Sequence, residues 1–134
     1  MREILFKAKR KDDGKWVEGY YQKRYDLLGN EEHLIFHADS YKVWEYAEID
    51  SETLCQFTGL CGKNGNKIWE NDIIQYDTVA AVAKFGEYGN GGLGFYVDFP
   101  EETNYRKDFS YWSKKVVVIG NAVDDRNLLQ EVPE

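Results

Sequence analysis

The strongest structural signal in this chain is the segment Gln56-Phe-Thr-Gly-Leu-Cys-Gly-Lys-Asn-Gly-Asn-Lys-Ile-Trp-Glu-Asn-Asp-Ile-Ile74. It predicts a strand, a glycine turn, a hairpin turn at Asn64-Gly65, and a second strand entered through Glu-Asn-Asp. Asn-Gly is typical of tight hairpins because the turn needs positive φ angles. We expect five residues of the segment to have structural roles. Gly59 and Gly65 permit backbone angles that other residues resist, and Thr58 and Asn64 can hydrogen-bond to nearby backbone amides. The carboxylate of Asp72 can cap the turn at the strand entry.

Short strands separated by turns are predicted along the rest of the chain. We expect an N-terminal hairpin from strands at 4–6 and 16–21 around a turn at 11–14, with Gly14 at positive φ. Further strands are expected at 33–37, 42–47, 72–76, 81–85, 93–99 and 116–119, the last one buried and stopped by Gly120-Asn121. Helical turns are expected at 51–54, capped by Ser51, and at 124–129, while 105–112 fits a short helix or a strand. This spacing predicts a mainly β fold with minor α, an antiparallel small barrel or curled sheet.

Length and composition are typical of one soluble globular domain. We expect a single domain over 1–134, with region 1–50 as a candidate subregion and a barrel core over about 51–123. The chain has 12 Gly and only 2 Pro, and 16% of its residues are aromatic, which favours β structure. It has no apolar run of membrane length, and we expect no signal peptide. We therefore expect a cytoplasmic protein that makes no membrane contact, with Cys55 and Cys61 reduced.

Charge is distributed unevenly. Residues 1–24 hold eight basic and four acidic side chains, whereas the remaining 110 hold nine basic and twenty acidic ones. Because an acidic body repels phosphates, nucleic-acid binding is not expected of the chain as a whole. The basic residues near the N-terminus form either a local patch or the solvated face of a hairpin; they are Lys7, Lys9, Arg10, Lys11, Lys15, Lys23 and Arg24.

None of the motifs that could support catalysis, cofactor binding or metal binding is a specific match. The run from Gly89 to Gly94 matches G-x-G-x-x-G, but it leads into a predicted strand rather than a helix, so it indicates a hairpin loop. Two histidines and two cysteines could form a zinc site, namely His33, His37, Cys55 and Cys61. Five residues separate the two cysteines, however, which is a wider spacing than structural zinc sites use. We therefore expect no cofactor, no metal and no enzymatic activity.

The central segment, together with Val118-Ile119-Gly120-Asn121 and the opening Met1-Arg-Glu-Ile-Leu-Phe-Lys-Ala, resembles the YopX-like family of phage and prophage proteins. The resemblance spans essentially the whole chain. The family usually shows Gly at the position of Asn71 and a charged residue near Cys61, so this chain departs from the pattern there. The resemblance implies a phage-encoded cytoplasmic protein that contains a β-barrel, self-associates and has no assigned function or catalytic residues.

The aromatic excess is the feature that favours a function. Tyr and Trp are enriched at protein interfaces, although sheets also carry Tyr on half-exposed faces without binding anything. As a candidate interaction surface the sequence offers Tyr20, Tyr21, Tyr88, Tyr96 and Trp112. The leading hypothesis is a non-enzymatic phage accessory protein that binds itself or a phage or host protein. The alternatives are a nucleic-acid module that uses the basic N-terminal residues, and an acidic mimic that inhibits a host DNA-binding protein.

Overall fold

The computed structural model describes residues 4–38, 41–89 and 91–125 of the chain. The chain divides into two compact units, which we call unit 1 (residues 1–57) and unit 2 (residues 58–134). Both are built mainly from antiparallel strands, as the sequence predicts. The expectation of a single domain stays a prediction.

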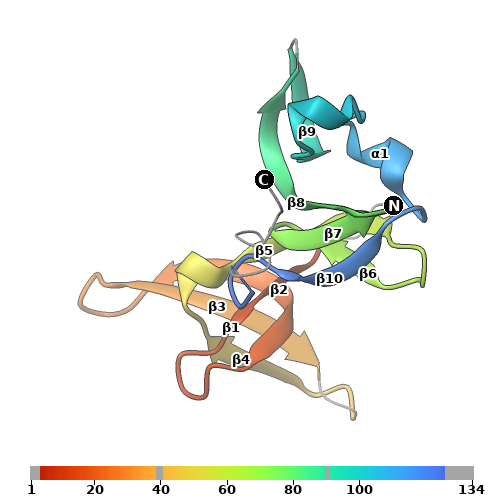
Figure 1. Cartoon of the computed structure of the whole chain (residues 1–134). Helices are drawn as coiled ribbons and strands as arrows, with labels where there is room; N and C mark the ends of the chain where they lie inside the picture. Colours follow the sequence, from red (N-terminus) through yellow and green to blue (C-terminus); the bar gives the residue numbers. More distant parts are fainter. Residues whose placement is uncertain (1–3, 39–40, 90, 126–134) are drawn as a thin grey trace. The chain divides into compact units, whose positions relative to one another are not determined.

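Unit 1 is a curled antiparallel sheet (Figure 1). Its strands are β1 (Phe6–Lys9), β2 (Trp16–Tyr25), β3 (Glu31–Ala38) and β4 (Trp44–Glu48), in the order β4-β3-β2-β1. The start of β5 (Cys55–Cys61) pairs with β1. The predicted N-terminal hairpin is confirmed, and Gly14 takes a φ of 70° in its turn.

The curl of this sheet brings its two ends together. Arg10, just after β1, forms a bridge with Ile49, just after β4. Side chains that alternate along the strands fill the inner side, and the buried ones are Ala8, Val17, Ile35 and Ile49. Gly19 lies where β2 crosses from β1 to β3, and a Cβ there would lie 2.1 Å from the carbonyl oxygen of Phe36. Only glycine allows this close approach of two strands.

A short 3₁₀ turn, η1 (Ser51–Thr53), lies between β4 and β5. The sequence predicts Ser51 as its cap, and that prediction is wrong. Asp50 is the cap, and its Oδ1 accepts a hydrogen bond from the backbone N–H of Glu52 at 3.0 Å. A carboxylate placed one residue earlier reaches the free N–H groups of the first turn equally well.

Unit 2 contains the end of β5 and the neighbouring strand β6 (Lys67–Trp69), together with a four-stranded sheet (Figure 1). The sheet has the order β10-β7-β8-β9, from β7 (Asp72–Tyr76), β8 (Val79–Tyr88), β9 (Gly92–Val97) and β10 (Val117–Asn121). Between β9 and β10 lie η2 (Glu101–Thr103) and α1 (Phe109–Trp112). The ambiguous segment 105–112 therefore contains a short helix.

The core of unit 2 gathers strand residues around three aromatic side chains from the β9–β10 connection. Its buried members are Ile68, Ile74, Ala81, Ala83, Val97, Phe99, Phe109, Trp112 and Val116. Trp112 is only 3% exposed, and its indole N–H donates to the carbonyl oxygen of Arg106 at 2.7 Å. The ring lies 5.0 Å from that of Phe99. Trp112 is therefore a core residue.

Three expectations about the fold need correction or lie outside the described residues. Within residues 4–38, 41–89 and 91–125 no closed barrel is found, so only the curled-sheet alternative agrees with the structure. The strand at 116–119 is not buried as a whole, because Val117 and Ile119 are exposed. It also runs on through Gly120 and Asn121, which pair with β7. The predicted helical turn at 124–129 lies mostly outside the described residues.

Candidate interaction surface

An aromatic strip crosses the outer side of the unit 1 sheet. Residues paired across antiparallel strands point to the same side, and Tyr20 pairs with Phe36, which in turn pairs with Tyr46. Trp44 lies two residues before Tyr46 on β4 and therefore shares its side. We call these four residues the aromatic strip.

The rings of the strip contact one another in pairs, and all except the half-buried Phe36 are exposed. The ring centroids of Tyr20 and Trp44 are 6.0 Å apart, and those of Phe36 and Tyr46 are 5.7 Å apart. Tyr20 is 49% exposed, Trp44 60% and Tyr46 58%. Ring contacts at these distances restrict side-chain rotation, so the strip presents ordered apolar area.

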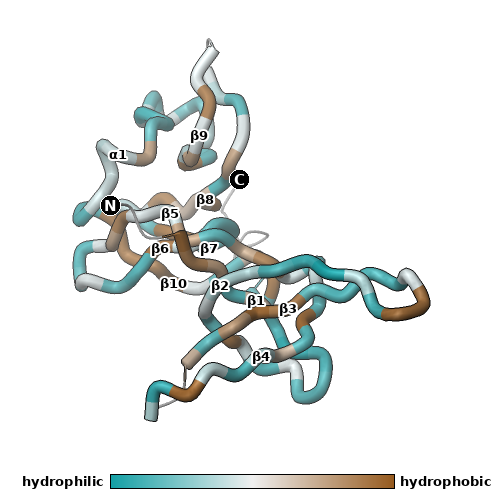
Figure 2. Tube along the Cα trace, turned by 180° about the vertical axis from the view of Figure 1, so that it is seen from behind, coloured by the Kyte–Doolittle hydropathy of each residue, from teal (hydrophilic) through white to brown (hydrophobic). Residues whose placement is uncertain are grey.

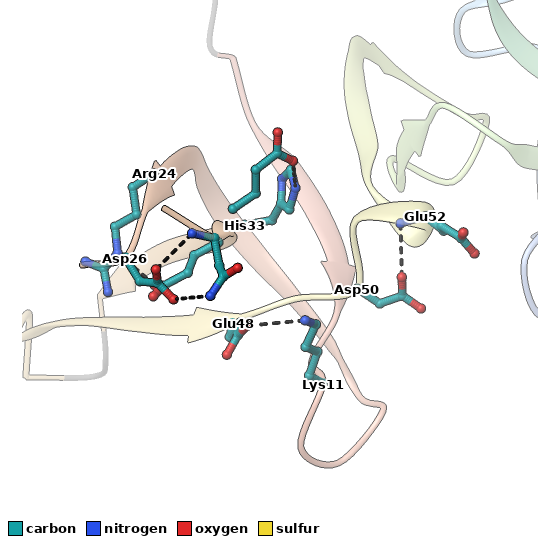
Figure 3. Close-up of polar contacts among 10 residues, drawn as sticks. Lys11, Arg24, Asp26, His33, Glu48, Asp50 and Glu52 are labelled. Atoms are coloured by element: carbon teal, nitrogen blue, oxygen red, sulfur yellow. Dashed lines mark hydrogen bonds and ion pairs between the residues drawn. The ribbon is translucent and has the colours of Figure 1, made fainter. Parts of the chain in front are cut away.

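Charged side chains surround the strip, and both signs are present. The Arg24 guanidinium lies 5.1 Å from the centre of the Tyr46 ring, and its Nε lies 3.0 Å from Oε2 of Glu32. Lys11 Nζ lies 3.2 Å from Oε1 of Glu48 (Figure 3). The strip thus has an aromatic centre and a polar edge, the arrangement typical of protein interfaces.

A second aromatic site on the same side of the sheet carries cations. Trp16 pairs with Lys9, and the ammonium groups of Lys7 and Lys9 lie 4.8 Å and 5.6 Å from the centre of its ring. The basic N-terminal residues do not all lie there, because Lys23 is directed to the other side of β2. Its ammonium group lies 3.0 Å from Oε1 of Glu31. Several of these cations have a carboxylate partner, which reduces the positive field of the segment.

The candidate surface residues named from the sequence do not gather at one place. Tyr20 belongs to the aromatic strip. Tyr21 points to the inner side of the same sheet, where its hydroxyl lies 2.6 Å from Nδ1 of His33. Tyr88 and Tyr96 stack on each other in unit 2, with ring centroids 5.3 Å apart. Trp112 is buried, so the prediction that it belongs to an exposed surface is wrong.

Sequence reasoning did not single out Phe36 and Trp44 as surface residues. Both lie in predicted strands, and strand alternation alone would have put Trp44 and Tyr46 on one side of β4. What was missing is the register of β2, β3 and β4, which joins the three strands into one row. The aromatic strip is therefore a product of pairing between strands.

The residues of the central segment have structural positions. Thr58 Oγ1 donates to the carbonyl oxygen of Ile68 at 2.7 Å and accepts from the N–H of Leu60 at 3.2 Å. Gly59 and Gly65 have φ angles of 86° and 82°, and Asn64 is exposed in the hairpin turn. These positions place the segment in the backbone framework of unit 2.

The acidic residue of the segment is buried at a strand entry. Asp72 is 2% exposed, and its Oδ2 accepts from the N–H of Trp69 at 2.8 Å. Asn71, directly before it, has a φ of 72°, a conformation that glycine adopts most easily. Gly120 follows a bulge in β10, and the Oδ1 of Asn121 accepts from the N–H of Val123 and of Asp124 at 3.0 Å and 2.8 Å.

Two of the four possible zinc ligands, His33 and Cys55, have other partners. His33 Nε2 lies 3.4 Å from Oε2 of Glu31, and Cys55 is buried with its thiol donating to the carbonyl oxygen of Thr53. Lys23, and to a smaller extent His33, hold the pKa of Glu31 below its usual range. Among the described residues no three His, Cys, Asp or Glu side chains gather to hold a metal ion.

A shallow hollow in unit 2 has a volume of about 390 Å³. Its lining combines two cations, one carboxylate and neutral side chains, namely Lys63, Gln75, Tyr76, Asp77, Lys115 and Val117. This mixture does not favour any one class of small molecule. The glycine-rich run at 89–94 follows β8 and extends into β9 from Gly92 onward, so it does not have the strand-to-helix setting of a dinucleotide site.

Comparison with known proteins gives one positive finding. A family model described as YopX protein matches residues 5–130 of the chain. No curated protein matches the chain. Across the part of the chain that the structure describes, no helix is long and apolar enough to cross a membrane.

Proposed function

This chain belongs to the YopX family, and we propose that it is a non-enzymatic, phage-encoded accessory protein that binds another protein through the aromatic strip of unit 1. The observation that supports this function is the row Tyr20–Phe36–Tyr46 on a hydrogen-bonded sheet. Tyr20, Tyr46 and the neighbouring Trp44 are exposed, and Phe36 is half-buried between the strands that carry them. Aromatic residues contribute much of the binding energy of protein interfaces when they are buried at the centre.

A sheet is a good platform for this purpose because its backbone does not have to order on binding. The entropic cost of association then falls mainly on side chains, and the ring contacts already restrict those of the strip. The charged edge, with Arg24 paired to Glu32 and Lys11 paired to Glu48, suits a partner surface of mixed charge. A second copy of the chain satisfies the same requirements.

A pull-down from host lysate, run with and without nuclease and combined with sedimentation velocity, tests this function. The wild-type chain should retain a protein partner after nuclease treatment or sediment as an oligomer. Trp44→Ser and Tyr46→Ser should each weaken that association. Phe85→Ser is the matched control, because Phe85 is a strand aromatic in unit 2 that is 54% exposed and makes one ring contact, with Phe95. Association that survives both strip substitutions would refute the proposal.

Single-stranded nucleic acid is the second candidate partner. The cations over the ring of Trp16 and the guanidinium over the ring of Tyr46 resemble the combination of stacking rings and charge that binds unpaired bases. The net charge of −7 weighs against it. Fluorescence anisotropy with a labelled oligothymidine should show binding that falls steeply with salt. Absence of binding at low salt would remove this candidate.

A further inference from the structure

The hairpin between β2 and β3 exposes two adjacent leucines at its tip. Leu27 is 105% exposed and Leu28 is 87% exposed. The hydropathy colouring shows the apolar tip at the end of a mostly hydrophilic hairpin (Figure 2). Single exposed apolar residues are common on protein surfaces, but two adjacent ones at the end of a projecting loop form a contiguous apolar contact.

The conformation of this tip is fixed by Asp26 (Figure 3). Its Oδ1 accepts from the N–H of Leu28 at 2.8 Å and from that of Asn30 at 2.9 Å, and its Oδ2 accepts from Asn30 Nδ2 at 3.2 Å. The backbone N–H of Asp26 also donates to the carbonyl oxygen of Asn30 at 2.9 Å. The backbone that carries the leucines is therefore fixed before any partner arrives, which lowers the entropic cost of inserting them.

The charges of the hairpin indicate what kind of partner fits. On the stem, Lys23 lies 3.0 Å from Glu31, and Arg24 lies 3.0 Å from Glu32. Each of these cations thus has a carboxylate partner, and Asp26 adds one further negative charge. The hydrogen bond from Asn30 holds the pKa of Asp26 below its usual range, so this carboxyl is ionised at neutral pH. A hairpin with an excess of negative charge does not suit an anionic lipid surface.

We propose that the tip of the β2–β3 hairpin is an anchor that inserts Leu27 and Leu28 into an apolar pocket on a partner protein, with a basic side chain at the edge of the pocket facing Asp26. This contact is separate from the aromatic strip. It does not depend on the strip being a binding surface.

Site-specific photo-crosslinking in the full-length chain tests this proposal. A benzophenone amino acid replaces Tyr25, which precedes the tip by two residues and leaves both leucines in place. The same amino acid at Asp13, on the polar tip of the β1–β2 hairpin, is the control. The expected result is a host or phage protein that crosslinks to position 25 and not to position 13. The crosslinked peptide of that protein should line an apolar pocket on its surface. The adduct should be lost in the Leu27→Ser/Leu28→Ser variant.

Affinity for the purified crosslinked protein gives the second readout. Each single substitution, Leu27→Ser or Leu28→Ser, should weaken binding by about tenfold or more, since each removes most of the apolar area of a leucine from the contact. Asp13→Ser should leave the affinity within about twofold. The substituted leucines are exposed, so the melting temperature should not change, which separates a binding loss from unfolding.

Four results would overturn the proposal. They are no adduct above the control, an adduct that persists without the leucines, an adduct between two copies of this chain, and cosedimentation with phosphatidylcholine–phosphatidylglycerol vesicles that requires the leucines. The last result would assign the tip to a lipid surface. Trp44→Ser should leave the tip adduct in place, so failure of the strip and failure of the tip are distinguishable.

Discussion

Replacing Trp112 with alanine should strongly destabilise unit 2. The side chain is 3% exposed and contacts Phe99, Tyr105 and Tyr76 at ring-centroid distances of 5.0, 5.5 and 4.8 Å. Removing a buried aromatic side chain costs about 3–5 kcal/mol of unfolding free energy. Loss of the indole hydrogen bond to Arg106 adds about 1 kcal/mol.

These costs are comparable to the whole stability of a unit of this size. Native proteins are stable by roughly 0.05–0.15 kcal/mol per residue, which gives on the order of 4–12 kcal/mol for a unit the length of residues 58–134. The cost of Trp112→Ala, about 4–6 kcal/mol in sum, should therefore remove from about a third to all of the stability of unit 2. Trp112→Phe keeps an aromatic ring but loses the donor, and should cost about 2 kcal/mol.

Urea unfolding followed by far-ultraviolet circular dichroism measures this effect, and Trp44→Ala is the matched control. Trp44 is the same residue type, but it is 60% exposed on β4, so its substitution should change the unfolding free energy by about 0.5 kcal/mol or less. If Trp112→Ala lowered the unfolding free energy no more than Trp44→Ala, Trp112 would not be a core residue. It would then again be a candidate for an interaction surface.

Three further substitutions test local features of the backbone and the charge. Asn71→Val should lower the unfolding free energy by about 1–2 kcal/mol more than Asn71→Gly, because a φ of 72° strains a β-branched residue. Urea titrations measure the difference, and equal effects of the two substitutions would contradict this reason. Gly19→Ala should lower the melting temperature more than Gly14→Ala. A Cβ at position 19 would lie 2.1 Å from the carbonyl oxygen of Phe36, whereas a Cβ at position 14 meets open space. A larger effect of Gly14→Ala would contradict this reason. The folded pKa of Asp26 is depressed, so its contribution to stability is present above the unfolded pKa and is lost as the pH falls below about 4. Melting temperatures of Asp26→Asn and wild type should therefore converge in acid, and a constant difference down to low pH would refute this cause.

Much of the secondary structure follows from local sequence. The Asn64-Gly65 hairpin, the Gly14 turn and the strands around them depend on backbone preferences of a few neighbouring residues. The sequence also showed the family, because its signature is a continuous run of such local features. The cap of η1 was missed by one residue, since Asp50 and Ser51 are both good caps and only the backbone geometry chooses between them.

The candidate site was only partly predictable. Tyr20 was named from the sequence, but the row that it forms with Phe36 and Tyr46 depends on the register of three strands that are far apart along the chain. Trp112 shows the opposite error, because nothing in its neighbourhood distinguishes a core tryptophan from an interface one. Its burial depends on residues contributed by other strands of unit 2.

The amino-acid sequence by itself determined where the chain turns, which segments extend and to which family it belongs, since turns and strands respond to backbone preferences within a few residues. The tertiary structure decided which aromatic side chains are buried and which share one side of the unit 1 sheet. The reason is that burial and register are set by contacts between segments distant in sequence, and each such contact depends on all the others being made at once.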